Sequence, residues 1–497
     1  MKMHIDRIAL LQCTIPSFVL LGSCHSNGAP EISGSKPNIV IVLSDDLGWS
    51  DVGYNGATYY ETPNIDKLAS EGMIFNRFYP SAANSAPSRA SLLTGMYSPR
   101  HGVYIPQGLA RGGDVAQMRF KVPTENQDST FNTFHVSINN VEPEFESLAE
   151  QMKKSGYISA RLGKWHIGDD NQGFDVVSSN GIIGDFSNNE GKEERYYGDI
   201  HVAEKLTDAA LGFIEENKNK PFFLYLAHWE VHSPKAARKE RINYFREKKK
   251  NSGVTELDPV YAAEIEQIDI SVGRVLNKLK ELKLEKNTIV IFSSDNGGVS
   301  DVTSNLPLRA GKGTFYEGGI RTPMCIRWPG IIKPGAETDF PVIGIDFMPT
   351  FAELTSSELP QNQPVDGISF LPLLKGEKFE NNRSIFFHFP LYLGGSKDAV
   401  LPSWNGEKNY WRAVPSTTIM SGDWKLIYYY EYEKYELFNL KEDISEATDL
   451  ASSKPERCKI LLEELNTWVK SVDAPVPSVS NDMLLKEDQG NKSKKNK

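Results

Sequence analysis

The chain has 497 residues, and 65 acidic residues against 55 lysines and arginines give a net charge of −10. This length suffices for a large core and more than one domain. The negative charge argues against a nucleic-acid-binding protein, so recognition of an anion must depend on local groups. Only Cys325 and Cys458 lie beyond the N-terminal segment, and one possible pair provides no disulfide framework.

Residues 1–23 have the features of a signal peptide. Lys2 and Arg7 precede an apolar run that is too short to span a membrane comfortably. The run ends in Leu-Gly-Ser-Cys, which resembles a bacterial lipobox with Cys24 as the lipidated N-terminus; the alternative is an ordinary signal with an incidental cysteine. Residues 24–35 are predicted to be a flexible tether. The chain is therefore expected to be exported, and to be periplasmic or lipid-anchored to a bacterial membrane.

Residues 36–377 are predicted to form a catalytic α/β domain, with a large, mixed but mostly parallel sheet sandwiched by helices. Four apolar runs are typical of strands buried on both faces, and amphipathic segments lie between them. The expected strands lie within residues 37–46, 156–166, 220–232 and 287–296, and the expected helices within residues 65–75, 145–156, 202–218 and 264–282.

The pattern changes near Glu377. Short alternating segments follow, which indicate antiparallel strands, and residues 455–472 have the pattern of a helix. We therefore predict a smaller C-terminal α+β domain over residues 378–475, made of an antiparallel sheet and a helix. Residues 476–497 are rich in lysine and asparagine and are predicted to be a disordered tail.

Polar residues follow the apolar runs where each expected strand ends. Asp45 and Asp46 follow the first run, and Asp295 and Asn296 follow the fourth. Ligands bind beyond the carboxyl ends of the strands in such sheets, so we expect these residues to meet there. Oxygen donors favour a hard cation, and a flexible carboxylate set favours calcium over magnesium. Alone, each pair would be more typical of a turn or a helix cap.

A second group of residues could surround a tetrahedral anion bound to that metal. Lysine and arginine supply charge and donors, and a histidine near its working pKa can pass a proton to a leaving oxygen. Each residue alone also has a plain alternative as part of a loop or turn. The group consists of Arg89, Lys164, His166, His232 and Lys312.

The segment NSAPSRASLLTG, residues 84–95, begins with small polar residues and continues into an apolar run that is typical of a helix. Pro87 suits the first turn of a helix and Gly95 suits its end. Ser85 would then lie at a helix N-terminus, where the dipole and free N–H groups favour negative charge and where a nucleophile for an anionic ester belongs. The alternative is that Ser85 or Ser88 only satisfies free backbone N–H groups.

The same segment resembles the signature of the type I sulfatases, Cys/Ser-x-Pro-Ser-Arg followed by Leu-Thr-Gly. Five further segments resemble other motifs of this family, in the family's order: SDDLGWSD, GKWHIG, HSP, SSDNGG and GKGTFYEGGIRTP. The resemblance covers roughly Lys36 to Leu450. It identifies the chain as a serine-type bacterial member of the formylglycine-dependent sulfatases, in the alkaline phosphatase superfamily.

The resemblance implies that an anaerobic sulfatase-maturating enzyme oxidises Ser85 to Cα-formylglycine, whose hydrate is the nucleophile. It implies that one calcium ion is held by Asp45, Asp46, Asp295 and Asn296, with residue 85 facing it. It also implies roles for the cationic residues: Arg89 and Lys164 would stabilise the hydrate, and His166, His232 and Lys312 would grip the sulfate and assist the leaving alcohol.

Two alternatives stay open. One is a phosphatase or phosphonate monoester hydrolase of the same superfamily, although such enzymes commonly use two metals with histidine ligands. The other is a non-catalytic sulfoglycan-binding protein in which Ser85 is unmodified. Since the polar positions of the motifs are intact, we expect an exo-acting carbohydrate sulfatase with a sulfated glycan as substrate.

The sequence says less about the sugar and nothing about the oligomeric state. The segment 107–143 lacks apolar periodicity, and loops of this length in a compact domain are often functional, so it could shape a sugar subsite. His388, from the second domain, could also reach the substrate. The alternatives are a surface excursion and a buried, hydrogen-bonded histidine.

Overall fold

A computed structural model of the chain describes residues 36–105, 110–111, 118–120, 130–131, 134–135, 141–168, 171–178, 202–233, 235–252, 257–394, 401–402 and 411–477. The predicted signal peptide and tether, nearly all of the predicted tail and most of the segment 107–143 lie outside these residues. Among the helices of the described residues, none is both long and apolar enough to cross a membrane.

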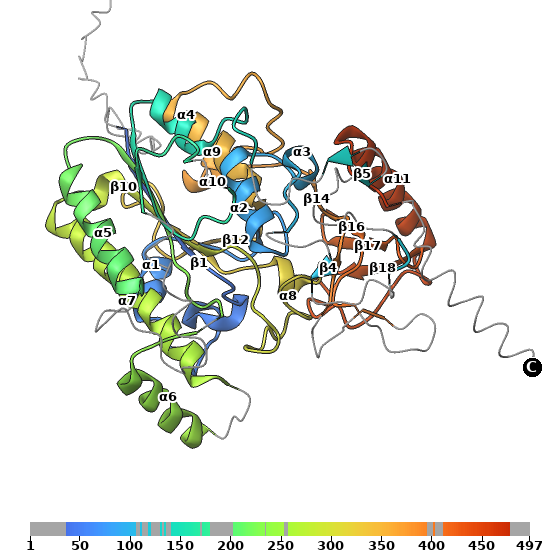
Figure 1. The fold of residues 1–497 in the computed structure, drawn as a ribbon, viewed down its shortest axis with the longest axis horizontal. Coiled ribbons are helices and arrows are strands. Elements are labelled where there is room, and N and C mark those ends of the chain that lie inside the picture. Colours follow the sequence, from blue (N-terminus) through green and yellow to red (C-terminus); the bar gives the residue numbers. More distant parts are fainter. Residues whose placement is uncertain are drawn as a thin grey trace, which may run out of the picture.

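The predicted mixed, mostly parallel sheet is confirmed, and it has eight strands within the described residues (Figure 1). Five neighbouring strands are parallel, whereas β11 is antiparallel to both of its neighbours. The order is β12 (Ala336–Thr338), β2 (Met73–Phe75), β11 (Met324–Arg327), β10 (Thr288–Ser294), β1 (Asn38–Ser44), β9 (Phe222–Ala227), β7 (Ile158–Gly163) and β8 (Val176–Val177).

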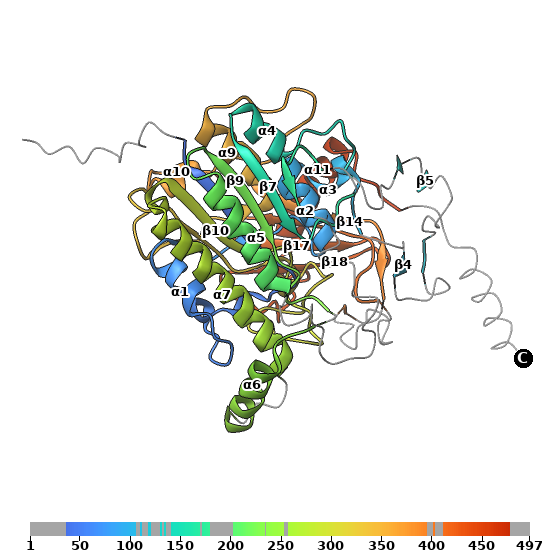
Figure 2. The same cartoon turned by 60° about the vertical axis from the view of Figure 1, so that its left-hand side comes forward.

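Helices cover both faces of this sheet, as predicted (Figure 2). Because side chains alternate along a strand, Val40 and Val42 of β1 pack in one hydrophobic cluster, and Ile39 and Ile41 pack in another. The first face is covered by α1 (Pro63–Ser70), α5 (Val202–Glu216) and α7 (Pro259–Glu281), and the second by α2 (Ser85–Thr94), α4 (Leu148–Lys154) and α9 (Phe347–Thr355).

The helix predicted over residues 65–75 is wrong in its second half. It ends at Ser70, and Met73–Phe75 forms β2. A Cβ at Gly72 would lie 2.2 Å from the carbonyl oxygen of Ile326, so the chain passes directly against β11 at this point. Pairing with β11 and β12 therefore overrides the helical period of the sequence, which is a non-local effect.

The predicted C-terminal unit is present as a four-stranded antiparallel sheet and a helix. These elements are β14 (Ser384–Phe389), β16 (Ser416–Ser421), β17 (Trp424–Tyr429), β18 (Lys434–Asn439) and α11 (Pro455–Ser471). We call this unit the C-terminal subdomain. Its core continues into the large domain, because Leu426 and Trp468 belong to one cluster with Tyr79 and Ile320.

The remaining elements complete the described fold. They are η1 (Trp49–Asp51), η2 (Gly53–Asn55), β3 (Phe78–Tyr79), α3 (Ser98–His101), β4 (Ala110–Arg111), β5 (Thr130–Phe131), β6 (Phe134–His135), α6 (Lys239–Ser252), η6 (Glu285–Asn287), α8 (Glu317–Ile320), β13 (Val342–Ile343), η7 (Gly344–Asp346), α10 (Leu371–Leu374) and β15 (Tyr392–Leu393).

Replacement of Gly163 at the end of β7 tests how closely the strands approach. Its φ is +98°, and a Cβ would lie 2.0 Å from the carbonyl oxygen of Ala227. We expect Gly163→Ala to lower the free energy of unfolding by about 2 kcal/mol or more. Gly212, in α5 with nothing near its Cβ position, is the control: Gly212→Ala should raise it by ~0.5–1 kcal/mol. Urea unfolding measures both, and equal stabilities would contradict this reading of the strand end.

Candidate active site

The proposed metal ligands meet at one edge of the sheet. β1 and β10 are parallel neighbours and Ser44 is in register with Ser294, so the residues that follow both strands lie together. One oxygen each from Asp45, Asp46 and Asp295 lies within 4.8 Å of the others, and all three residues are buried.

Asn296 completes this group. Its amide Nδ2 donates to Asp46 Oδ1 over 2.8 Å, while its Oδ1 accepts from Ser85. A cluster of carboxylate and amide oxygens without sulfur is the donor set of a hard cation. The residues present therefore fit a hard divalent cation, and calcium is one such ion.

Ser85 is the first residue of α2, and its side chain points at the carboxylate group. Ser85 Oγ lies 3.1 Å from Asp45 Oδ1 and 3.0 Å from Asn296 Oδ1, and the hydroxyl can donate to one of them at a time. Ser88 instead donates to the carbonyl of Ala82, and neither serine side chain caps the helix. The structure therefore separates the two serines, because only Ser85 faces the cluster.

Three cations pair with the three carboxylates. Arg89, one turn after Ser85, donates from Nε to Asp295 Oδ2 over 2.8 Å. Lys164, at the end of β7, donates to Asp45 Oδ2 and its Nζ lies 3.5 Å from Ser85 Oγ. Lys312 donates to both oxygens of Asp46, over 2.6 and 2.8 Å.

Burial and the ion pairs shift the pKa values of the site residues in opposite directions. Burial raises the pKa of Asp45, but Lys164, with smaller effects of His232 and Arg89, holds it well below its ordinary value. Burial dominates at Asp295 and raises its pKa, even though Arg89 is adjacent. Burial likewise lowers the pKa of Lys164 despite its contact with Asp45. The site is therefore a desolvated cluster in which each charge depends on its partners.

The two site histidines differ in environment. His166 has a φ of +71°, and within the described residues its buried Nδ1 makes no hydrogen bond. Burial, followed by the charge of Lys164, lowers the pKa of His166 to about 2, so the ring is neutral near pH 7. The His232 side chain is 32% exposed, and its Nε2 lies 3.9 Å from Asp46 Oδ2. His232 is thus at the open side of the cluster.

His388 makes no hydrogen bond to these carboxylates within the described residues, although it lines a small cavity that also borders Asn84. It is buried in the C-terminal subdomain, and both ring nitrogens are bonded, Nδ1 to Thr417 Oγ1 and Nε2 to the carbonyl of Pro475. Burial lowers its pKa to about 4. The structure therefore favours the buried, hydrogen-bonded histidine over the substrate ligand.

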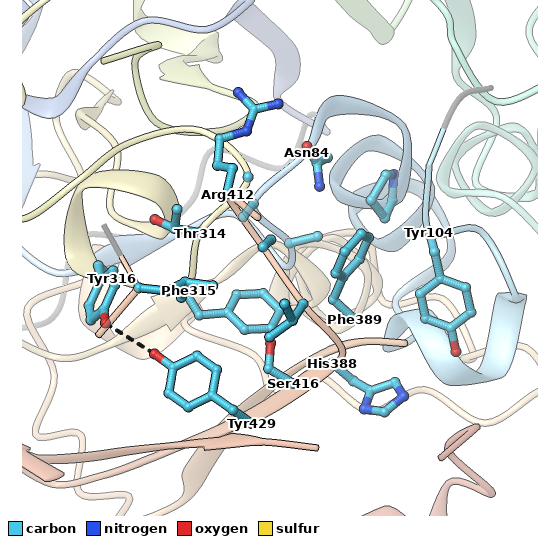
Figure 3. A pocket seen from close by; sticks show the side chains of 17 residues that line it. Asn84, Tyr104, Thr314, Phe315, Tyr316, His388, Phe389, Arg412, Ser416 and Tyr429 are labelled. Atoms are coloured by element: carbon cyan, nitrogen blue, oxygen red, sulfur yellow. Dashed lines mark hydrogen bonds between the residues drawn. The ribbon is translucent and has the colours of Figure 1, made fainter. Parts of the chain in front are cut away.

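A small cavity of about 20 Å³ adjoins the helix start, and Figure 3 shows the side chains around it. It is large enough for a water molecule and too small for a sugar. Asn84 and Arg412 were not singled out by the sequence. Arg412 lies against Gly313, whose Cβ position is 3.2 Å from Arg412 Nε, and therefore close to Lys312. No sequence motif could have indicated this, because the contact joins two domains.

Comparison with known proteins shows the family of this chain. The family described as Sulfatase matches residues 37–357, and the family described as N-sulphoglucosamine sulphohydrolase, C-terminal, matches residues 311–472. A Formosa agariphila protein named Sulfatase is 29% identical over 89% of this chain and 90% of its own length. The N-acetylgalactosamine-6-sulfatase of Mus musculus is 33% identical over 73% of this chain and 69% of its own length.

A solved structure gives the same result for the fold. The crystal structure of Ps i-CgsB in complex with k-i-k-neocarrahexaose superposes with a TM-score of 0.68 at 28% identity, covering 90% of this chain and 95% of that one. Since the family match extends over well over half of the chain and includes the carboxylates, the helix start and the lysines described above, this protein belongs to the sulfatase family and is a sulfuric ester hydrolase.

Proposed function

We propose that the protein hydrolyses sulfate esters of carbohydrates, with formylglycine at position 85 and one calcium ion. The observation that carries this proposal is the place of the Ser85 hydroxyl, at a helix N-terminus, about 3 Å from both Asp45 and Asn296 and within reach of Lys164. The relatives' names support a sugar substrate, since one is an N-acetylgalactosamine-6-sulfatase and another was solved with a neocarrahexaose.

Residue 85 would act after oxidation by an anaerobic maturating enzyme. The hydrate of formylglycine supplies one hydroxyl that attacks sulfur and a second that allows sulfate to leave, which serine cannot do. All ten residues of α2 are buried, including Pro87 and Arg89. A maturating enzyme that binds this segment must therefore act before the chain has folded.

The surrounding side chains have separable tasks. Asp45, Asp46, Asp295 and Asn296 would hold calcium. Arg89 and Lys164 place positive charge beside residue 85, where a desolvated cation stabilises an oxyanion strongly. Lys312 lies at the entrance, 16% exposed, and can bind a sulfate oxygen. The partly exposed His232 can protonate the leaving sugar oxygen, while the half-buried, neutral His166 can donate a hydrogen bond to sulfate.

The location and partners belong to the same proposal. The N-terminal signal features support export, with the mature protein periplasmic or held at a membrane by lipidated Cys24. An exported enzyme would meet its substrate outside the cytoplasm, and we expect that substrate to be a sulfated glycan. Recognition of its charge would be local, because the chain as a whole carries −10.

The maturation proposal predicts the outcome of expression in different hosts. With an anaerobic radical maturase, the Ser85 peptide should lose two hydrogen atoms and the enzyme should turn over sulfate esters. Without it, the chain should fold and remain inactive. Ser85→Cys should be active in a host with cysteine-directed machinery, whereas Ser85→Ala should be inactive in every host. Intact-mass analysis with an activity assay measures this; full activity with unmodified serine would instead favour the phosphatase-like alternative.

The metal proposal predicts a calcium-dependent melting temperature. A ligand that binds only the folded state raises Tm, so calcium should stabilise the parent protein relative to excess chelator. Asp46→Asn should remove most of that increase, because one of three carboxylates is lost from the cluster. Asp301→Asn, at an exposed position, is the matched control and should retain it. Calorimetry in both buffers measures the shift, and an unchanged shift in Asp46→Asn would refute this ligand set.

The leaving-group proposal predicts a substrate-dependent effect of His232→Ala. A sugar alcohol needs protonation to leave, whereas a nitrophenolate does not, so the loss in kcat should be at least about 100-fold on a sugar sulfate and much smaller on an aryl sulfate. His166→Asn is the control, because a sulfate-binding group should affect both substrates alike. Steady-state kinetics on the two substrates measure the ratio, and equal losses for His232→Ala would exclude a proton donor there.

A further inference from the structure

The segment 309–317 carries Lys312 and is held at both ends by one residue of the C-terminal subdomain. At its start, Arg309 Nη1 donates to the main-chain carbonyl of Glu446 over 2.8 Å. At its end, the backbone N–H of Glu317 donates to Glu446 Oε2 over 2.6 Å. Glu446 is fully buried and has a φ of +52°. Its main-chain carbonyl binds the start of the segment, and its side chain binds the end.

Lys425, on β17, joins the two carboxylates at the end of the segment. Its Nζ lies 3.0 Å from Glu317 Oε1 and 2.8 Å from Glu446 Oε1, and all three side chains are fully buried. Tyr79 and Arg321 contact the second oxygen of Glu317, over 3.0 and 3.3 Å. These contacts join the large domain to the subdomain through charged groups within a continuous apolar core.

A second contact supports the same segment. The hydroxyl of Tyr429 donates to that of Tyr316 over 3.2 Å, and Figure 3 shows the two rings on opposite sides of the contact. The Arg309 guanidinium lies 4.0 Å from the centre of the Tyr316 ring. Strand β17 of the subdomain, and the chain that follows β18, therefore bind the segment on either side of Lys312.

The segment itself is closed at its ends, and next to Lys312 the backbone N–H of Gly313 donates to the carbonyl of Ala83 over 2.8 Å. Gly318 N donates to the Arg309 carbonyl over 2.9 Å, and a Cβ at Gly318 would lie 2.4 Å from the carbonyl of Ala310. Lys312 N donates to Gly298 O over 2.9 Å, which leaves the side chain directed at Asp46. A displacement of Glu317 would therefore move the backbone that carries Lys312.

Three buried ionisable side chains join the two domains here, and burial raises the pKa of Glu446 to about 7 despite its contact with Lys425. Apolar residues of similar volume often stabilise a core as well or better, whereas removal of one member of a buried ion pair is strongly destabilising. Unlike an apolar contact, however, each hydrogen bond of this group fixes the position of a particular partner atom.

We propose that Glu446 and Lys425 are positioning residues for Lys312: Glu446 contacts both ends of segment 309–317 and Lys425 contacts its end at Glu317, and together they hold the lysine where it binds the sulfate group. This inference rests on the sulfate-binding role of Lys312 in the proposed function. It assigns to the C-terminal subdomain a part in the affinity of the site, through residues that do not contact substrate.

A double-mutant cycle with Lys312→Ala tests the proposal in the matured enzyme. Glu446→Ala is the main variant, because it leaves Lys425 paired one-to-one with Glu317, and Lys425→Met is the second. We expect Glu446→Ala to lower kcat/KM for an aryl sulfate about tenfold in the parent and less than about twofold in Lys312→Ala, a coupling of ~1.4 kcal/mol at most. Titration calorimetry with inorganic sulfate should show the same non-additivity in binding.

Two further variants separate positioning from general destabilisation. Glu446→Gln keeps an acceptor for the Glu317 N–H and should recover most of the sulfate affinity. Arg383→Met breaks another contact between the domains, the partly buried ion pair with Asp346, and should have equal effects in the parent and in Lys312→Ala. Equal losses for Glu446→Ala in both backgrounds would overturn the proposal. If Lys312→Ala alone leaves sulfate binding and turnover unchanged, the role of Lys312 in the proposed function fails, and this inference fails with it.

Discussion

The mutual repulsion of three buried carboxylates is the constraint on which this site depends. Asp45, Asp46 and Asp295 lie within 4.8 Å of one another, away from solvent, and such a group is stable only when opposite charges are adjacent. Each carboxylate has its own cation, and the three cations come from a helix, a strand end and a loop. The charge balance of the site therefore requires three distant parts of the chain to meet.

This balance also explains how an acidic protein can bind an anion. The cations neutralise the carboxylates, so a bound divalent cation would leave the site with a net positive charge in a desolvated place. With that cation bound, the field of the site would be opposite in sign to the net charge of the chain. Ser85 lies at the centre of this field, at the positive end of α2.

The two domains act as one packed unit. The core cluster that contains the subdomain residues Leu426 and Trp468 also contains Phe315 and Ile320, which follow Lys312 closely in the chain. The place of Lys312 therefore depends on residues more than one hundred positions later in the sequence. Asp46 and His166, two residues of the site, both have positive φ. Such strained backbone states persist only where surrounding contacts enforce them.

The elements with strong periodicity and the chemical nature of the site could be predicted from local sequence patterns. The apolar runs before Asp45 and Asp295 are local patterns that predict buried parallel strands. In a parallel pair such as β1 and β10, the carboxyl ends lie at the same edge of the sheet, so these residues meet there. Features that depend on residues far away in the chain could not be predicted in this way. The residues around Met73 became a strand because β11 lies beside them, and His388 lost any free nitrogen because Thr417 and Pro475 bind it. The difference between Ser85 and Ser88, which are equivalent as helix-start residues, likewise arises only because strands from elsewhere in the chain place Asp45 and Asn296 beside one of them.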